Sequence, residues 1–329
     1  MSDDVNALAP AFELPVPELG PWRAGNTGIE GVWQWDSGLP GRDVLVSALV
    51  HGNELCGAWA LCAALDAGLR PRRGRLTLAF CNLAAFDRFD AAAPDASRFV
   101  DEDFNRVWGP GLHDGSVRSV ERERARQLRP LVERADWLLD LHSMHEPGEP
   151  LLLTGLAPRH RALARELGAP RCVIVDAGHA EGRRMRDHGR FGGIEGAGGD
   201  DGTRSLLLEC GWHGALSSRT VALDMLARFL AAAGTVGEAD LPAGWRQAPP
   251  PAQCLLDVTD AVVARSMDVR FARHWSNGET VPQAGTVLGW NDGRPFVTPY
   301  ADCTLVMPSL RQLRPGVTVM RLARALPAG

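Results

Sequence analysis

The sequence of 329 residues contains no lysine, so all 35 of its basic residues are arginine. This absence excludes Schiff-base chemistry on a lysine and any phosphate-binding loop that depends on one. It also leaves arginine and protonated histidine as the side-chain cations available to bind an anion. Acidic and basic residues are interspersed and the formal net charge is −5, so no basic face indicates a nucleic-acid partner.

The chain also lacks any apolar run of about 18 residues, so no membrane span or membrane partner is expected. Its first residues, Met-Ser-Asp-Asp, do not have the basic start and apolar stretch of a secretory signal. Seven cysteines, an odd number without CxxC spacing, indicate neither a disulfide framework nor a zinc knuckle. We therefore expect a cytoplasmic protein whose thiols are mostly buried.

Strand-like apolar runs alternate with helical stretches through most of the chain. This alternation predicts the α/β class, with a mostly parallel or mixed sheet covered on both faces. The expected strands are 31–35, 43–50, 75–81, 137–142, 151–154, 171–175 and 205–210, and the expected helices are 54–69, 117–135 and 217–233.

Two stretches interrupt this pattern. Residues 179–201 are rich in glycine and arginine and are not expected to pack as a core element, so their length and position favour a lid. The spacer Ala-Pro-Pro-Pro-Ala at 248–252 precedes short strands separated by turns. We therefore predict a catalytic domain over 1–247 and a small β-rich domain over 253–329.

Ligands for a metal ion occur where buried strands end. His51 and Glu54 stand three residues apart between a strand and a helix, and His142 ends another apolar run. In an open α/β sheet such strand ends meet at one edge. Together the three side chains could hold one Zn²⁺ per chain and leave a position open. His51 and Glu54 alone would also suit the start of a surface helix, but His142 and Glu209 favour the metal.

Four further residues suit the hydrolysis of an amide at such a metal. Zn²⁺ lowers the pKa of water toward about 7 and polarises a carbonyl. Glu209 could take the proton from that water and return it to the leaving amine. Arg98 could stabilise the oxyanion, while Arg106, with Asn105 beside it, offers a bidentate fork for a substrate carboxylate.

Structural alternatives exist for these residues. Glu209 could be a strand-end carboxylate paired with an arginine, and Arg106 could form an ion pair with Asp101 or Asp103. His145 lies three residues after His142, so on an extended chain it points to the opposite face and is not expected to bind the same metal. His213 is a candidate pocket residue. Asp140 shares a side of its strand with His142 and is a candidate hydrogen-bond partner behind the metal ligand.

Four motifs, in this order, resemble the succinylglutamate desuccinylase/aspartoacylase family, a branch of the zinc carboxypeptidase fold. They are His51-Gly-Asn-Glu54, Arg98 with Asn105-Arg106, Asp140-Leu-His142 and Glu209-x-Gly211, and they span residues 44–211. The resemblance implies a carboxypeptidase-like mixed sheet flanked by helices, with a smaller β domain that closes over the site. It implies zinc at His51, Glu54 and His142, general acid/base catalysis by Glu209, carbonyl polarisation by Arg98, and carboxylate binding by Asn105 and Arg106.

The resemblance also assigns a substrate contact to Tyr300, the only tyrosine of the chain, which could instead be a half-buried phenol between the domains. The sequence departs from the family at Phe104, where leucine is usual, and at Cys210-Gly211-Trp212-His213. The arginine that reads a second carboxylate in aspartoacylase has no single counterpart. The candidates are Arg183, Arg184, Arg186, Arg190 and Arg204.

The predicted function is therefore a zinc amidohydrolase of the kind that cleaves linear amide bonds in small N-acyl amino acids. Alternatives are a zinc carboxypeptidase acting on peptides and a non-catalytic protein that binds zinc or a metabolite. The expected partner is a small-molecule substrate, and the sequence leaves the possibility of a homo-oligomer open.

Overall fold

The computed structural model describes residues 11–193 and 201–326 and shows a mixed α/β fold. Its strands are β1 (Val32–Asp36), β2 (Asp43–Ala48), β3 (Arg75–Phe80), β4 (Trp137–Met144), β5 (Leu151–Leu153), β6 (Cys172–Val175), β7 (Arg204–Trp212), β8 (Cys254–Val263), β9 (Val269–Phe271), β10 (Thr280–Val281), β11 (Val287–Asn291), β12 (Arg294–Val297), β13 (Cys303–Val306) and β14 (Thr318–Ala325). The α-helices are α1 (Leu55–Asp66), α2 (Leu83–Phe86), α3 (Val120–Arg134), α4 (Pro158–Leu167) and α5 (Leu216–Ala232). Short 3-10 helices are η1 (Gly20–Trp22), η2 (Pro94–Ser97), η3 (Phe104–Arg106), η4 (Pro110–His113), η5 (Met185–Asp187), η6 (Gly189–Gly192) and η7 (Glu238–Asp240).

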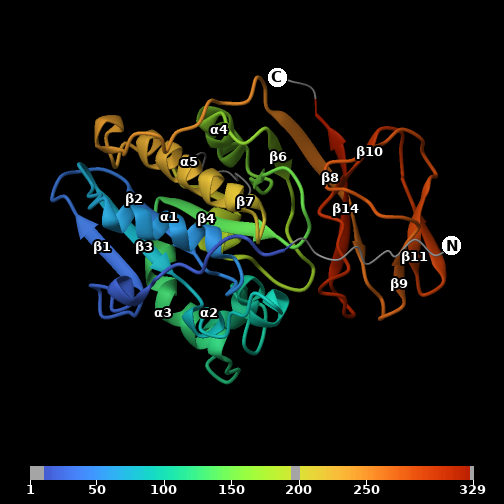
Figure 1. The fold of residues 1–329 in the computed structure, drawn as a ribbon, viewed down its shortest axis with the longest axis horizontal. Coiled ribbons are helices and arrows are strands. Elements are labelled where there is room, and N and C mark those ends of the chain that lie inside the picture. The colour runs from blue at the N-terminus through green and yellow to red at the C-terminus, as the bar shows by residue number, and fades with distance from the viewer. Residues whose placement is uncertain (1–10, 194–200, 327–329) are drawn as a thin grey trace.

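Eleven strands form one large mixed sheet in the order β1-β3-β2-β4-β7-β5-β6-β8-β14-β13-β10, and β12-β11-β9 form a small antiparallel sheet. The pairs β2–β3, β2–β4 and β4–β7 are parallel, as the alternating pattern of strands and helices predicts. Figure 1 shows the helices around the first half of the large sheet and the C-terminal strands at its other end. The predicted α/β class with a smaller β part is confirmed.

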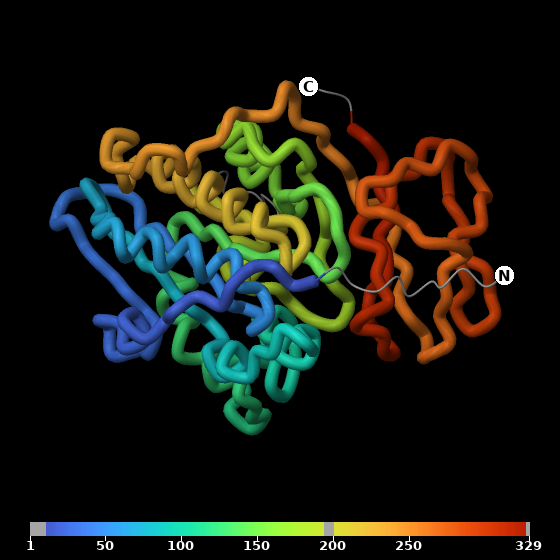
Figure 2. The backbone as a smooth tube through the Cα atoms, viewed as in Figure 1, coloured from blue at the N-terminus to red at the C-terminus, as the bar shows by residue number. Residues whose placement is uncertain are grey.

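The C-terminal strands continue the large sheet. β8 pairs with β6 in parallel, and β14 pairs with β8 in the antiparallel sense. Figure 2 shows the chain leaving α5 and passing α4 before it reaches β8. The division into domains 1–247 and 253–329 stays a prediction.

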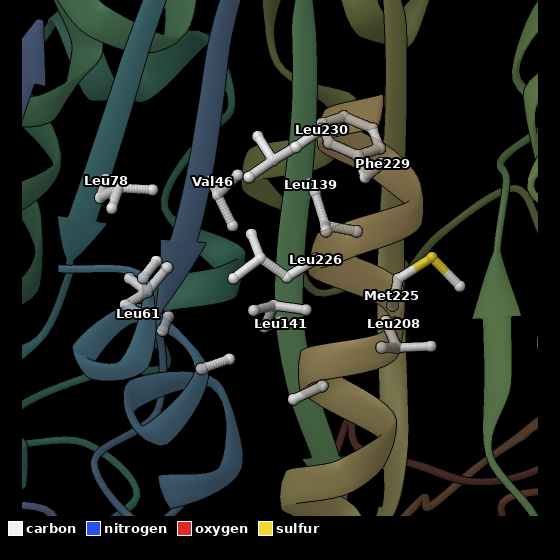
Figure 3. Close-up of a cluster of buried hydrophobic side chains, with 14 of the residues drawn as sticks. Val46, Leu61, Leu78, Leu139, Leu141, Leu208, Met225, Leu226, Phe229 and Leu230 are labelled. Atoms are coloured by element: carbon white, nitrogen blue, oxygen red, sulfur yellow. The ribbon is translucent and has the colours of Figure 1, made fainter. Parts of the chain in front are cut away.

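Helices cover both faces of the central strands. On one face, Leu61 of α1 and Leu226 and Phe229 of α5 pack against β-strand residues such as Val46 and Leu139 (Figure 3). On the other face, the neighbouring strand residues pack against α3 in a second buried cluster. Successive strand residues point to opposite faces, so buried strands covered on both sides are apolar throughout. No helix within 11–193 or 201–326 is long and apolar enough to span a bilayer.

The helix boundaries differ from the sequence predictions at their ends. α1 begins one residue later than expected, with Glu54 at its N-cap, so that carboxylate stays outside the helix. α3 begins at Val120 rather than 117, because the Ser119 hydroxyl accepts a hydrogen bond from the Arg122 backbone N–H and caps the helix. α4 was not predicted, since its polar sequence carries few apolar residues.

The expectation that residues 179–201 stay outside the core is wrong for the part that the structure describes. Arg184, Met185 and Arg186 are buried, and so is Phe191. Buried arginines are tolerated here because Arg184 pairs with Asp176 at 2.9 Å and Arg186 pairs with Asp187 at 2.7 Å. Composition misled the prediction because ion pairing lets charged side chains pack inside. Residues 194–200 of the proposed lid lie outside the described residues.

His160 makes folding stability sensitive to pH. This buried side chain of α4 accepts a hydrogen bond from the Ser205 backbone N–H at Nδ1 and donates one from Nε2 to the Phe191 carbonyl. Burial, then nearby Arg186, lowers its pKa from 6.5 to about 3. The unfolded chain therefore binds a proton below pH 6.5 that the folded chain does not, and the free energy of unfolding should fall by about 1.4 kcal/mol per pH unit from there down to about pH 3.

Urea unfolding at pH 7, 6, 5 and 4 measures this slope. His160→Gln, which cannot be protonated, should reduce it by roughly that amount over the same window, whereas His113→Gln, at an exposed position, should not. Equal slopes in the wild type and His160→Gln would contradict the assignment.

Candidate active site

Adjacent parallel strands bring the predicted site residues to one edge of the large sheet. His51 and Glu54 follow β2, His142 lies in β4, and Glu209 lies in β7. His142 and Glu209 are register partners across β4 and β7. Because β2, β4 and β7 are neighbours and run in the same direction, the side chains converge although they are far apart in the sequence.

The turn after β2 has a backbone that places both ligand candidates. Leu49 has a φ of 56°, an uncommon left-handed conformation for a residue with a side chain. Gly52 lies so close to the chain that an added Cβ would be 2.4 Å from the Ser97 carbonyl oxygen, and its N–H donates to the Arg98 carbonyl. Only glycine fits there, which explains its place between His51 and Glu54 and ties this turn to Arg98.

The three predicted metal ligands lie together in the core of the protein. His51 Nδ1 is 2.7 Å from Glu54 Oε1, and His142 Nδ1 is 2.7 Å from Glu54 Oε2. All three side chains are buried, and their ligand atoms lie within 4.8 Å of one another. The sequence analysis thus selected residues that the fold brings together.

A carboxylate holds the far side of each imidazole. His51 Nε2 is 3.0 Å from Asp103 Oδ1, and His142 Nε2 is 2.8 Å from Asp140 Oδ2. Ser47 of β2 in turn donates to Asp140. Such partners fix the tautomer and orientation of metal-binding histidines, and leave each Nδ1 free to act as the ligand. Asp140 was a candidate for this place, but Asp103 was considered only as an ion-pair partner of Arg106, because its contact with His51 depends on tertiary structure.

This donor set suits a divalent cation. Imidazole nitrogen and carboxylate oxygen are the ligands that zinc prefers in catalytic sites. The carboxylates of Glu54, Asp103, Asp140 and Glu209 are all buried. Glu209 Oε2 is buried and has no hydrogen-bond partner within the described parts of the chain. Unpaired buried carboxylates are unfavourable unless a cation or a proton neutralises them.

The pKa shifts in the metal-free protein show this excess of negative charge. Burial and the neighbouring Glu54 raise the pKa of Glu209 well above its usual value. Burial opposes the charged form of His142, but Asp140 and Glu54 outweigh it and hold the pKa of the imidazole well above its usual value. For Glu54, His51 and His142 outweigh burial and hold the pKa well below its usual value.

Arg98 reaches the site from a loop that α3 holds in place. The Glu121 carboxylate of α3 accepts hydrogen bonds from the backbone N–H groups of Val100, Asp101 and Glu102. Arg98 Nη1 lies 3.2 Å from Glu54 Oε1, and Nη2 lies 3.2 Å from Asp103 Oδ2. Its guanidinium lines the pocket beside the ligand cluster.

Arg106 and Asn105 also line this pocket. Asn105 Oδ1 accepts from the Met185 backbone N–H, which fixes its side chain. Arg106 is 3.9 Å from Asp103 and 3.7 Å from Glu181, too far for a hydrogen bond in either ion pair. The predicted alternative, an ion pair with Asp103, is therefore present but loose.

A histidine and an arginine that the sequence analysis did not select complete this side of the pocket. His179 Nδ1 is 3.2 Å from Arg106 Nη2, and its Nε2 is 2.8 Å from Nη2 of Arg321 in β14. Burial, then Arg321 and Arg106, lowers the pKa of His179 well below its usual value, so the ring is neutral and accepts at only one nitrogen. Arg321 Nε is buried without a hydrogen-bond partner in the described residues, although Asp176 lies 3.4 Å away. At 3.4 Å this ion pair is a weak contact for a buried guanidinium.

Other candidates lie outside the pocket or are engaged elsewhere. Arg184 lines the pocket but pairs with Asp176 and Asp187. Arg183, Arg186, Arg190 and Arg204 are not among its described lining residues. Tyr300 is also outside that lining: its hydroxyl bonds with Thr259, and Arg324 stacks 4.2 Å from its ring centroid. The structure therefore does not bring Tyr300 to the pocket.

His145 and His213 form a separate group with Asp95. His145 is not grouped with His51, Glu54 and His142, although it lines the same pocket and its Nε2 lies 3.2 Å from Arg98 Nη1. His213 is not among the described residues that line the pocket.

The comparisons with known proteins agree with this geometry. Residues 40–188 match the succinylglutamate desuccinylase/aspartoacylase catalytic domain. The resemblance inferred from the four motifs is thereby confirmed. The match to this catalytic domain includes the metal-ligand candidates and Arg106, and it ends before Glu209 and the C-terminal strands. No curated protein matches the chain.

Solved structures share the fold along most of the chain. A succinylglutamate desuccinylase from Vibrio cholerae has 19% identity and a TM-score of 0.63, with 90% of this chain and 86% of that chain covered. An aspartoacylase family protein from Mesorhizobium loti has 18% identity and a TM-score of 0.58, with coverage of 90% and 89%. The ectoine utilization protein EutE (DoeB) from Ruegeria pomeroyi has 19% identity and a TM-score of 0.60, with coverage of 86% and 85%. At these identities the likeness shows the fold alone.

Proposed function

We propose that the protein is a zinc-dependent amidohydrolase that cleaves the amide bond of a small N-acyl amino acid or a related carboxylate. The observation that carries this proposal is the buried Glu209, whose Oε2 has no hydrogen-bond partner in the described residues, beside the His51, Glu54 and His142 cluster in a pocket lined by arginines. The match to the desuccinylase/aspartoacylase catalytic domain supports the same reaction class.

His51, Glu54 and His142 would hold the metal. Zn²⁺ bound there would lower the pKa of water and polarise the substrate carbonyl. Asp103 accepts a hydrogen bond from His51 Nε2, and Asp140 accepts one from His142 Nε2. These contacts keep the Nδ1 atom of each ring directed at the cluster.

Glu209 would move the proton. Its ionised carboxylate takes a proton from the attacking water and returns it to the leaving nitrogen. Its position opposite His142 on the next strand, in the lining of the same pocket, supports this role. Arg98 would donate N–H groups to the carbonyl oxygen as negative charge develops there.

Arg106 and Arg321 would bind the substrate carboxylate. Arg321 is buried and Arg106 is half-buried, and both direct N–H groups at a neutral His179 that cannot accept from all of them. A carboxylate between them would accept hydrogen bonds from both guanidinium groups. In this proposal Arg321 would fill the role for which the sequence analysis considered the arginines of residues 183–204. Asn105 stays a candidate contact beside Arg106.

A substrate panel tests the proposal. The protein should be stripped with a chelator, reloaded with Zn²⁺, and given N-acetyl and N-succinyl amino acids and short peptides. We expect release of acetate or succinate, loss of the activity in the stripped protein, and recovery after reloading. Cleavage of peptides at their C-terminal residue would support the carboxypeptidase alternative. Zinc binding with no hydrolysis of any compound would support the non-catalytic one.

A further inference from the structure

A second group of potential metal ligands lies beside the proposed catalytic site. Asp95 belongs to η2, His145 follows β4, and His213 follows β7, so three separate segments supply it. His145 Nδ1 is 2.9 Å from Asp95 Oδ1 and 3.3 Å from His213 Nε2. The three ligand atoms lie within 4.8 Å of one another.

The donor set and spacing resemble those of the first cluster. Both contain two imidazoles and one carboxylate, a combination found in zinc sites. Tetrahedral bonds of roughly 2.0–2.2 Å place neighbouring ligand atoms about 3.3 Å apart. The separations of 2.9 and 3.3 Å around His145 Nδ1 are near this value, so small movements would admit an ion.

Second contacts orient one of the two rings for metal binding. His213 Nδ1 is 2.8 Å from the Ser143 hydroxyl, which directs Nε2 into the cluster. Burial and His145 hold the pKa of His213 well below its usual value, and burial lowers that of His145. Both imidazoles are therefore neutral near pH 7 and can offer a nitrogen lone pair.

An ion could reach this group without entering the substrate pocket. A separate cavity is lined by Asp95, His145, His213, Phe12, Trp212 and Arg311, among other residues. His145 also lines the substrate pocket, so its ring stands in the wall between the two cavities. Asp95 is partly exposed, whereas His213 is buried.

We propose that Asp95, His145 and His213 form a second site for a divalent transition metal such as Zn²⁺. The site binds more weakly than the first one, because fewer carboxylates surround it and two cations are near. Arg98 Nη1 is 3.2 Å from His145 Nε2, and Arg311 lines the same cavity as Asp95.

Occupation of this second site would change the environment of Arg98. In the metal-free arrangement His145 Nε2 accepts from Arg98, which requires the proton of the ring to be on Nδ1. A metal on Nδ1 moves that proton to Nε2, and Nε2 can then no longer accept from Arg98. If the proposed function holds, a second equivalent of metal should therefore lower kcat.

Metal stoichiometry of the full chain tests the site directly. The stripped protein is titrated with Zn²⁺ in equilibrium dialysis, and with Co²⁺ while its visible absorption is followed. We expect a tight and a weak equivalent in the wild type. His213→Ala and Asp95→Ala should each keep the tight equivalent and lose the weak one, and His51→Ala should do the reverse. His274→Ala, at an exposed position, is the matched control and should keep both.

The outcomes separate this site from the proposed function. A wild type that binds a single equivalent, sensitive to His51→Ala alone, would overturn the second site and leave the hydrolase proposal intact. So would a weak equivalent that persists in both His213→Ala and Asp95→Ala with normal thermal unfolding. A single equivalent lost in His213→Ala and kept in His51→Ala would support the second site and contradict the first.

Discussion

Glu209→Gln should keep zinc and lose turnover by about 10²–10⁴-fold, the usual contribution of a general acid/base. Glutamine has nearly the same shape but cannot accept a proton from water. The carboxylate that it replaces lines the pocket, and burial and Glu54 raise its pKa above the usual value. Zinc should still bind, since Glu209 is not one of the clustered ligands.

Metal content and steady-state kinetics of the reloaded variant check this result. Glu149→Gln is the matched control, because that glutamate is largely exposed and pairs with Arg171 away from the pocket. The control should keep wild-type kcat. Retention of more than about a tenth of kcat in Glu209→Gln would show that another group activates the water.

The metal-ligand cluster could be predicted because its members depend mainly on local pattern. His51 and Glu54 follow one apolar strand and His142 ends another, and parallel neighbouring strands bring such ends to one edge. The expected order of strands was not needed in detail. Glu209 could be placed by the same reasoning, since β7 is a third apolar run that reaches that edge.

The substrate side could not be predicted in the same way. Arg321 lies in β14. This strand reaches the pocket because it pairs with β8, which in turn pairs with β6. These contacts join residues 55 to 82 positions apart, and no local pattern at 321 indicates them. The loop arginines offered as candidates have partners that the sequence does not reveal, because Arg184 and Arg186 are engaged by Asp176, Asp187 and Ser205 inside the protein.

Asp103 and His179 show a further limit. The motif around Asn105 and Arg106 drew the sequence analysis to this segment, but the contact of Asp103 with His51 is set by the fold of the loop. His179 lies in a glycine-rich stretch without a recognisable motif, so nothing in the sequence indicates a functional role for it. Its place between Arg106 and Arg321 follows only from the tertiary structure.

Arg321→Ala and Arg106→Ala should each reduce kcat/KM roughly 30-fold or more for a substrate with a free carboxylate. This factor corresponds to a loss of at least about 2 kcal/mol of transition-state stabilisation. Each variant removes one side of a charge-assisted contact in a buried place, where its loss is not made up by water. Zinc content should not change. Arg324→Ala is the matched control, since Arg324 lies on the same strand but is exposed and stacks on Tyr300.

The same substrates with the carboxylate amidated separate recognition from folding. If the arginines bind that carboxylate, the amidated compounds should lose much less from either substitution, whereas an equal loss would show a structural role. The double variant adds a further distinction. If the double variant loses less transition-state stabilisation than the two single variants lose together, both guanidinium groups bind one carboxylate, because removing the first weakens what the second can contribute. Additive losses would place them on two separate anionic groups, and the preferred substrates would then be dicarboxylates.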